Sequence, residues 1–286
     1  MFSAHPADPA RASSDLGLVR AARRTFSGPA SFLADSGNRA RVGEYITDMA
    51  GPYQVKVADN ALEGQSYGEM AEALISSAVS ADEPVGLLIL AFAVHDLRPG
   101  RQTAAYLSDV APGAPLGFAI CDQGVAAAFT GLRIAREYSR SAGIERALLI
   151  VVEQAALPYE CPVPLPAEHR GVVLHLGTGP APQARITGMR QHASVVPAHV
   201  PDAAAGGLAE LSAGREAGLV ISDALAGVWP APAAARVRVT PPGQPSTGVW
   251  WSLIDELAGP PGLTVVADYD PELCYLCLTA FDAPAS

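Results

Sequence analysis

The sequence lacks an excess of positive charge. Its 286 residues include 19 lysines and arginines against 29 aspartates and glutamates, which gives a net charge of −10 at pH 7. Proteins that bind nucleic acids or anionic membranes usually present a basic face, so this composition excludes both as expected partners. An acidic carrier protein would need a local basic patch. The candidate arginines for such a patch are Arg98, Arg101, Arg133, Arg136 and Arg140.

Long apolar runs are also missing. No stretch approaches the roughly 20 apolar residues that a helix needs to cross a bilayer, and the first residues contain no hydrophobic core of a signal peptide. We therefore expect a soluble, cytoplasmic protein. Residues 1–17 are rich in Pro, Ala, Ser and Asp, and this composition predicts a disordered tail.

Cysteine is scarce. Cys121, Cys161, Cys274 and Cys277 are spread through a long chain, which does not suggest a disulfide framework. Cys274 and Cys277 have the C-x-x-C spacing, but they fall in an alternating strand pattern, where this offset puts the two side chains on opposite faces. We expect no metal site and no bound cofactor.

The sequence does contain a regular alternation of strand and helix patterns, with 49% hydrophobic residues to build a core. Strand patterns occur at residues 85–92, 116–120, 147–152, 171–176, 184–189, 219–222, 236–239, 263–267 and 274–280. Helical periodicity occurs at residues 66–79, 99–110, 124–142, 203–217 and 247–257. An early strand within residues 18–33 is broken at Gly28, and residues 41–61 show no clear pattern. The alternation predicts an α/β fold with parallel strands, with a first half at residues 18–190 and a second half at residues 191–286, which the resemblance given below implies is shortened.

Cys121 is the candidate nucleophile. It follows the apolar run Leu116–Ile120 and precedes an amphipathic helix pattern at residues 124–142. The unpaired N–H groups and positive dipole at a helix start favour a thiolate and the oxyanion that forms when it attacks a thioester. An inert buried cysteine is the alternative. Asp122 opposes reactivity, because a neighbouring carboxylate raises the pKa of a thiol.

Three stretches resemble the type III ketoacyl synthases of the thiolase superfamily. These are LLILAFAVHDLRPGRQTAAYLSDV at residues 87–110, the cysteine-containing stretch at residues 114–153, and the loop, helix and closing hairpin at residues 243–278. Together they cover most of residues 66–280. The resemblance implies the thiolase-like fold, in which two duplicated βα halves form a layered αβαβα arrangement, and it implies that Cys121 is the residue that accepts the acyl group.

The resemblance also exposes departures from the family pattern. In the family, a histidine and an asparagine of the second half bind the thioester carbonyl of the malonyl donor. Here Asp223 stands at the expected histidine place and Gln244 at the expected asparagine place. A carboxylate cannot donate hydrogen bonds at neutral pH, so decarboxylative condensation is not expected. His95, in the loop after the strand at residues 85–92, could serve as a base for Cys121, and an exposed loop histidine is the alternative.

Two functions are open, and the retained Cys121 favours the first of them, with the second as the alternative. The first is an acyltransferase that forms an acyl thioester on Cys121, taken from acyl-CoA or an acyl carrier protein, and passes it to an acceptor in fatty-acid-like or polyketide biosynthesis. The second is a non-catalytic partner subunit of a heterodimeric ketosynthase-like enzyme. We expect a homodimer or a heterodimer with a ketosynthase-like chain, because the uncharged strand at residues 115–120 would otherwise leave an apolar edge exposed.

Overall fold

The computed structural model describes residues 16–160 and 165–285. In this part of the chain, ten strands form one sheet in the order β3-β2-β4-β5-β1-β6-β10-β9-β7-β8. The strands are β1 (Gly17–Phe26), β2 (Leu87–Ala91), β3 (Leu116–Ile120), β4 (Arg146–Glu153), β5 (His169–Gly177), β6 (Ala184–His192), β7 (Ala217–Ile221), β8 (Arg236–Val239), β9 (Gly262–Asp270) and β10 (Tyr275–Ala283). The helices are α1 (Ser36–Ala50), α2 (Tyr67–Ala78), α3 (Thr103–Val110), α4 (Ala126–Ala142), α5 (Val200–Ser212), α6 (Asp223–Val228) and α7 (Gly248–Leu257), with short 3-10 helices at Ser31–Ala34, Gly51–Tyr53 and Pro197–His199.

The sheet consists of two five-stranded units with the same topology. In the first unit, β2 lies parallel between β3 and β4, and β5 runs antiparallel to both β4 and β1. In the second unit, β7 lies parallel between β8 and β9, and β10 runs antiparallel to both β9 and β6. Two residue pairs between β1 and β6, Gly17 with Arg185 and Leu18 with Ala184, join the units. The predicted duplication into two βα halves is confirmed.

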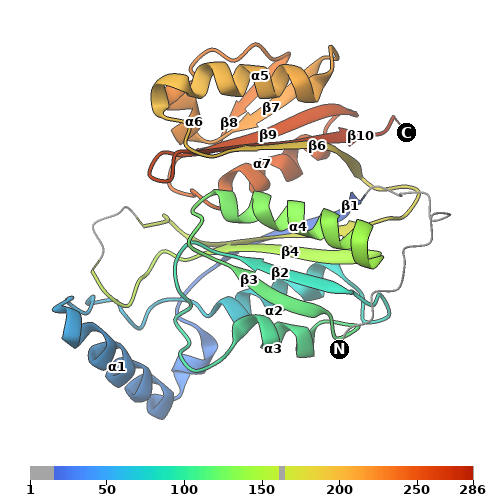
Figure 1. The fold of residues 1–286 in the computed structure, drawn as a ribbon. Helices are drawn as coiled ribbons and strands as arrows, with labels where there is room; N and C mark the ends of the chain where they lie inside the picture. The colour runs from blue at the N-terminus through green and yellow to red at the C-terminus, as the bar shows by residue number, and fades with distance from the viewer. Residues whose placement is uncertain (1–15, 161–164, 286) are drawn as a thin grey trace.

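Helices and sheet units alternate in five layers (Figure 1). α2 and α3 cover the outer face of the first unit, α5 and α6 cover the outer face of the second, and α4 and α7 lie between the units. Strand geometry explains the layering, because successive side chains point to opposite faces. In β4, Leu149 and Val151 belong to the central apolar cluster, whereas Leu148 and Ile150 belong to the outer cluster around α2.

The two central helices hold the halves together. Phe129 of α4 and Trp250 of α7 are fully buried, and their ring centroids lie 4.7 Å apart. Such aromatic pairs add to the stabilisation from buried area alone. Gly131 lets α4 approach the first unit closely, since a Cβ there would lie 2.6 Å from a methyl of Leu149. The core between the halves is therefore formed by residues from both halves.

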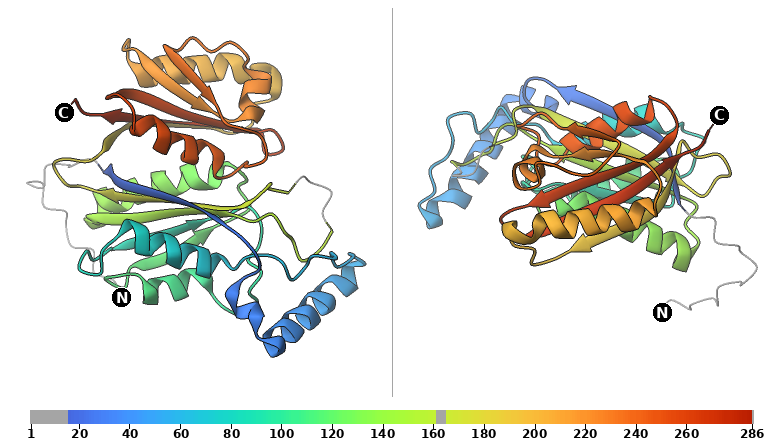
Figure 2. Two further views of the ribbon diagram at one scale, coloured as in Figure 1. Left: turned by 180° about the vertical axis from the view of Figure 1, so that it is seen from behind. Right: turned by 90° about the horizontal axis from the view of Figure 1, so that it is seen from above.

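The sequence pattern misses α1. The Asp35 carboxylate accepts a hydrogen bond from the Asn38 N–H at 2.7 Å and so caps this helix. Its three buried residues, Val42, Ile46 and Ala50, pack only in a small separate cluster, so its apolar signal is weak. Figure 2 shows α1 projecting away from the five layers.

The strand pairing assigns β6 to the second half, whereas the sequence pattern divides the halves at residue 190. β5 and β6 resemble a hairpin in sequence because the turn-like segment GTGPAPQ separates them. Both edges of β5 are already occupied by β4 and β1, so β6 pairs with β10 instead.

The predicted tail, residues 1–17, overlaps the fold at its end, because Leu16 is buried and Gly17 begins β1. Residues 1–15 and Cys161 lie outside the described residues. None of the helices in the described ranges is long and apolar enough to cross a membrane.

Candidate functional site

The candidate site lies where the carboxyl ends of the parallel strands of both units meet. Loops at this edge carry the functional groups of many open α/β folds. Cys121 follows β3, Glu153 ends β4, Ser222 follows β7 and Asp270 ends β9. The two edges are in contact, because Asp270 hydrogen-bonds the start of α4 and Glu153 hydrogen-bonds the start of α7.

Cys121 lies at the end of β3, as predicted, but it does not open the helix. A turn of residues 122–125 separates it from α4, and Asp122 and Gly124 in this turn have φ angles of 59° and 49°. The partly buried Sγ of Cys121 lies 3.3 Å from Oδ2 of Asp122 and donates to it. Burial raises the pKa of the Cys121 thiol, and the hydrogen bond and negative charge of Asp122 raise it further. The thiol form is therefore favoured.

Asp270 occupies the start of α4. Its Oδ2 accepts a hydrogen bond from the Val125 N–H at 3.3 Å, and its Oδ1 accepts from the N–H groups of Glu272 and Leu273 at 3.1 and 2.9 Å. Gly124 permits this approach, since a Cβ there would lie 1.8 Å from Oδ2. The helix-start N–H that was expected to favour a thiolate therefore binds a carboxylate from the second half.

Glu153 plays the corresponding part at the start of α7. This buried carboxylate accepts hydrogen bonds from the N–H groups of Ser246 and Thr247 at 2.9 and 3.2 Å, and from the Thr247 hydroxyl. Burial raises the pKa of Glu153 to about 6, although these hydrogen bonds and the charge of Arg170 act in the opposite direction.

His95 lies in the loop after β2, the strand that pairs with β3. The His95 side chain is exposed, and its backbone carbonyl accepts a hydrogen bond from Nε2 of Gln154 at 3.0 Å. The neighbouring Asp96 accepts hydrogen bonds from the Tyr67 N–H and the Thr103 hydroxyl, at 3.0 and 2.7 Å. This loop therefore fits the alternative of an exposed histidine.

Asp223 and Gln244 lie in different environments, since Asp223 is exposed and Gln244 is buried with its Oε1 lacking a hydrogen-bond partner. Asp223 is the exposed first residue of α6, a helix where the sequence pattern indicates a loop. The buried residue at the end of β7 is Ser222, whose Oγ caps α6 by accepting from the Leu225 N–H at 3.1 Å. Gln244 is buried, and its Nε2 donates to the carbonyl of Glu168 at 3.4 Å.

Sequence reasoning missed the buried acids at this edge. Asp268 of β9 is fully buried, its Oδ1 accepts a hydrogen bond from the Tyr269 N–H at 2.8 Å, and burial raises its pKa to about 7. Its Oδ2 has no hydrogen-bond partner. Asp268, Asp270 and Glu153 share one sequence signal, which is an acidic residue at the carboxyl end of an apolar strand.

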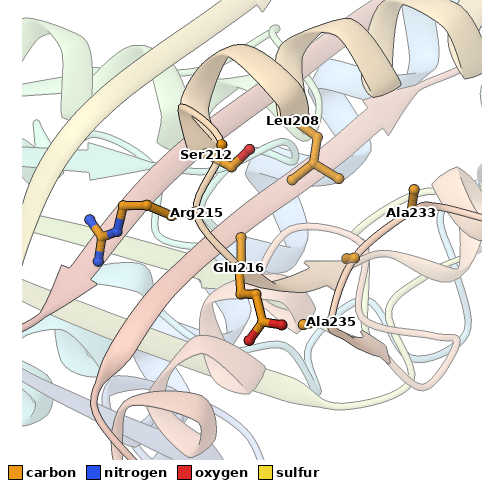
Figure 3. Close-up of a pocket in the computed structure, with 9 residues that line it drawn as sticks. Leu208, Ser212, Arg215, Glu216, Ala233 and Ala235 are labelled. Atoms are coloured by element: carbon orange, nitrogen blue, oxygen red, sulfur yellow. The ribbon is translucent and has the colours of Figure 1, made fainter.

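A cavity of about 250 Å³ lies elsewhere in the second half (Figure 3). It is lined by the end of α5 and by the residues just before β7 and β8, including Ser212, Glu216 and Ala235. These are the amino ends of the parallel strands, so this cavity is at the opposite edge from Cys121. Arg215 on its wall is held by two hydrogen bonds to Asp282, at 2.7 and 2.8 Å.

Comparison with solved structures identifies the fold. The chain superimposes on the acyltransferase ChlB3 with a TM-score of 0.63 and 16% identity, covering 95% of this chain and 98% of that one. It matches the tetronic acid condensing enzyme AbyA1 with a TM-score of 0.65 and 15% identity over 94% and 100% of the two chains. The 3-oxoacyl-[acyl-carrier-protein] synthase III of Aquifex aeolicus VF5 matches with a TM-score of 0.58 and 13% identity over 93% and 99%.

These comparisons establish that the chain has the thiolase-like fold of type III ketoacyl synthases, as the sequence resemblance implied. No family model matches the sequence, and no curated protein matches it. The fold is thus shared with proteins described as acyltransferases and condensing enzymes.

Proposed function

We propose that this chain is a non-catalytic partner subunit of a ketosynthase-like enzyme. The observation that supports this most strongly is the start of α4, where Asp270 binds the Val125 N–H and Cys121 lies beyond the turn. A nucleophilic thiolate and the oxyanion of its reaction both need positive potential at this point. Here negative charge lies at both ends of the turn, with Asp122 beside Cys121 and Asp270 beside Val125.

The first half offers an edge for the catalytic chain. β3 is the end strand of the sheet, and Leu116 on it is 52% exposed. An unpaired edge with an exposed apolar side chain invites pairing with another strand. Gly117 faces α3, since a Cβ there would lie 2.1 Å from Oγ of Ser108. Leu116 and Ala119 are the two exposed residues of β3, so a partner strand would contact them.

Acyl-thioester labelling tests the proposal. The purified chain and its Cys121→Ala variant are incubated with acetyl-CoA, longer acyl-CoA thioesters and acyl carrier protein thioesters, and intact masses are compared. We expect no acyl mass that depends on Cys121, and no carbon dioxide from malonyl thioesters. Acylation of the wild-type chain that Cys121→Ala abolishes would overturn the proposal.

Sedimentation tests the pairing. If β3 is the partner edge, the purified chain forms a dimer or a complex with a ketosynthase-like chain, and Leu116→Glu dissociates it. Glu replaces an apolar contact with a charge without changing the inward-facing Gly117. If the chain stays monomeric both alone and when co-expressed with a ketosynthase-like chain, β3 is not a partner edge.

An acyltransferase is the second candidate, favoured by the partly exposed position of Cys121 at the end of β3. In that case Asp122 would accept the Cys121 proton as the sulfur attacks an acyl thioester, the bond from the acyl carbon to the donor sulfur would break, and the donor sulfur would take that proton from Asp122 and leave as a thiol. A carboxylate is a weak base for a thiol whose pKa is raised, so this route would be slow. The labelling experiment separates the two candidates.

A further inference from the structure

The two central helices lack caps of their own. The N-cap residues Val125 of α4 and Thr247 of α7 make no side-chain capping hydrogen bond, and neither helix has an acidic residue in its first turn. Two other helices of the described chain, α1 and α6, are capped by their own N-cap residues, whereas α2, α3 and α5 also make no side-chain capping hydrogen bond. Asp35 caps α1 and Ser222 caps α6. Because unpaired N–H groups at a buried helix start are costly, α4 and α7 need partners from elsewhere.

These partners come from the opposite half. Glu153, the last residue of β4, binds the N–H of Thr247, and Asp270, the last residue of β9, binds the N–H of Val125. β4 and β9 hold the same place in the two units, next to β2 and β7 respectively. The contacts are therefore equivalent, and each crosses from one half to the central helix of the other.

The Asp270 contact also fixes the turn that carries Cys121. Residues Asp122 and Gly124 adopt left-handed φ angles, which are uncommon for a residue with a side chain. Val125 alone stands between these residues and the helix. Asp270 anchors the N–H of Val125, and the left-handed Asp122 directs its carboxylate onto the Cys121 sulfur.

We infer that Glu153 and Asp270 are a crossed pair of positioning residues, in which each half sets the start of the other half's central helix. Through this pair, Asp270 holds the turn in which Asp122 faces Cys121. The inference goes beyond the proposed function, because it applies whether or not Cys121 ever carries an acyl group.

Hydrogen exchange of the full chain, resolved by peptide, tests the crossing. In Asp270→Ala we expect amides of the first turn of α4 to exchange about 2-fold to 30-fold faster, the range that corresponds to loss of an N-cap. Glu153→Ala should do the same at α7. Asp35→Ala is the matched control, and its effect should stay within α1. Unchanged exchange at both central helices would overturn the crossed pair.

The reactivity of Cys121 tests the positioning role. Alkylation by iodoacetamide is measured against pH and assigned to Cys121 by peptide mass spectrometry. We expect Asp270→Ala to lower the apparent pKa of Cys121, and a pKa lower by one should make alkylation at neutral pH about tenfold faster. Asp270→Asn keeps the hydrogen-bond acceptor and should retain the wild-type profile, which a role through charge alone would not allow.

A third variant keeps the test decisive if Asp270→Ala does not fold. Gly124→Ala leaves Asp270 in place but displaces its carboxylate from the turn, so it should shift the Cys121 profile in the same direction as Asp270→Ala. If Asn and Ala at position 270 give the same profile, or if Gly124→Ala gives the wild-type profile, the positioning role is wrong. The result of the acyl-labelling experiment does not change how these alkylation profiles are interpreted.

Discussion

β4 and β9 occupy equivalent places in the two halves, and their last residues differ in one instructive way. Both strands end in a carboxylate, Glu153 and Asp270, that reaches the opposite half. Two residues earlier, β4 has Val151 and β9 has Asp268, and both are buried. The duplicated strands thus share the group that joins the halves and differ in a residue that faces the central layer.

The neighbouring strands show how each half accommodates its residue. Val151 pairs in register with Ala91 of β2, so the first half has an apolar contact at this point. In the second half, Oδ1 of Asp268 accepts a hydrogen bond from the Tyr269 N–H at 2.8 Å, its Oδ2 has no hydrogen-bond partner, and burial raises its pKa to about 7. The comparison teaches that this layer accommodates an acid by favouring its neutral form, since an unpaired buried charge is strongly destabilising.

The most severe way to break this comparison is to put the acid of the second half into the first. We expect Val151→Asp to lower the free energy of unfolding by about 5 kcal/mol at pH 7, because Ala91 offers no hydrogen bond. Urea unfolding measures the loss. Val151→Asn separates charge from shape, and lowering the pH to 4 should restore part of the stability of the Asp variant. A loss under about 1 kcal/mol would mean that this layer tolerates charge.

The next test uses the titration of Asp268 itself. Its pKa is raised by burial to about 7 from an ordinary value of 3.8, so the folded state binds a proton that the unfolded state has already released. The free energy of unfolding should therefore fall as the pH rises from about 4 to about 7, by about 4 kcal/mol in all. Glu153 contributes with the same sign up to its pKa of about 6.

Asp268→Asn isolates this contribution. The amide oxygen can still accept the Tyr269 N–H hydrogen bond but the amide does not ionise, so the decline with pH should become much shallower. Urea unfolding at several pH values between 4 and 8 measures both proteins. An unchanged slope in Asp268→Asn would mean that Asp268 is not the group that titrates.

The comparison also separates what sequence could predict from what it could not. Apolar periodicity predicted the strands and long helices from residue 66 onward, because each buries a continuous apolar face. It missed α1, which buries little, and α6, which has only six residues. The end of β3 at Cys121 followed from the local pattern. Glu153 and Asp270 could not be paired with their helices, because 94 and 145 residues separate the partners in sequence.

Glycine substitution gives a smaller and local test of the start of α4. Gly124→Ala should lower the free energy of unfolding by about 1–3 kcal/mol, from the left-handed φ angle and the collision with Asp270. Gly206→Ala, in the exposed middle of α5, is the matched control. A Cβ there meets nothing within 4 Å, so this change should stabilise by up to about 1 kcal/mol. Equal effects of the two changes would contradict the close approach of Asp270.

In the outer layer it is the first half that has the buried titratable residue, His175, and its expected effect is the smallest. It lies in β5 opposite Leu148, at the place that Ala280 holds in β10 opposite Val265. Both ring nitrogens are buried without a hydrogen-bond partner. Burial lowers the pKa of His175, and the charges of Arg20 and Arg146 act in the same direction, whereas Glu83 and the carbonyl of Ala78 oppose them.

A lowered pKa means that the unfolded chain binds a proton before the folded chain does, so His175 should reduce stability as the pH falls below its ordinary value of about 6.5. This is opposite in sign to the effect of Asp268 over an overlapping pH range. His175→Phe should therefore steepen the gain in stability on acidification, while Asp268→Asn flattens it. Urea unfolding of the double variant should show only the shallower decline that Glu153 causes between about pH 4 and its pKa of about 6. If His175→Phe leaves the wild-type profile unchanged, the pKa of His175 is the same in the folded and unfolded chain. The pH dependence of stability then comes from the acids of the central layer alone.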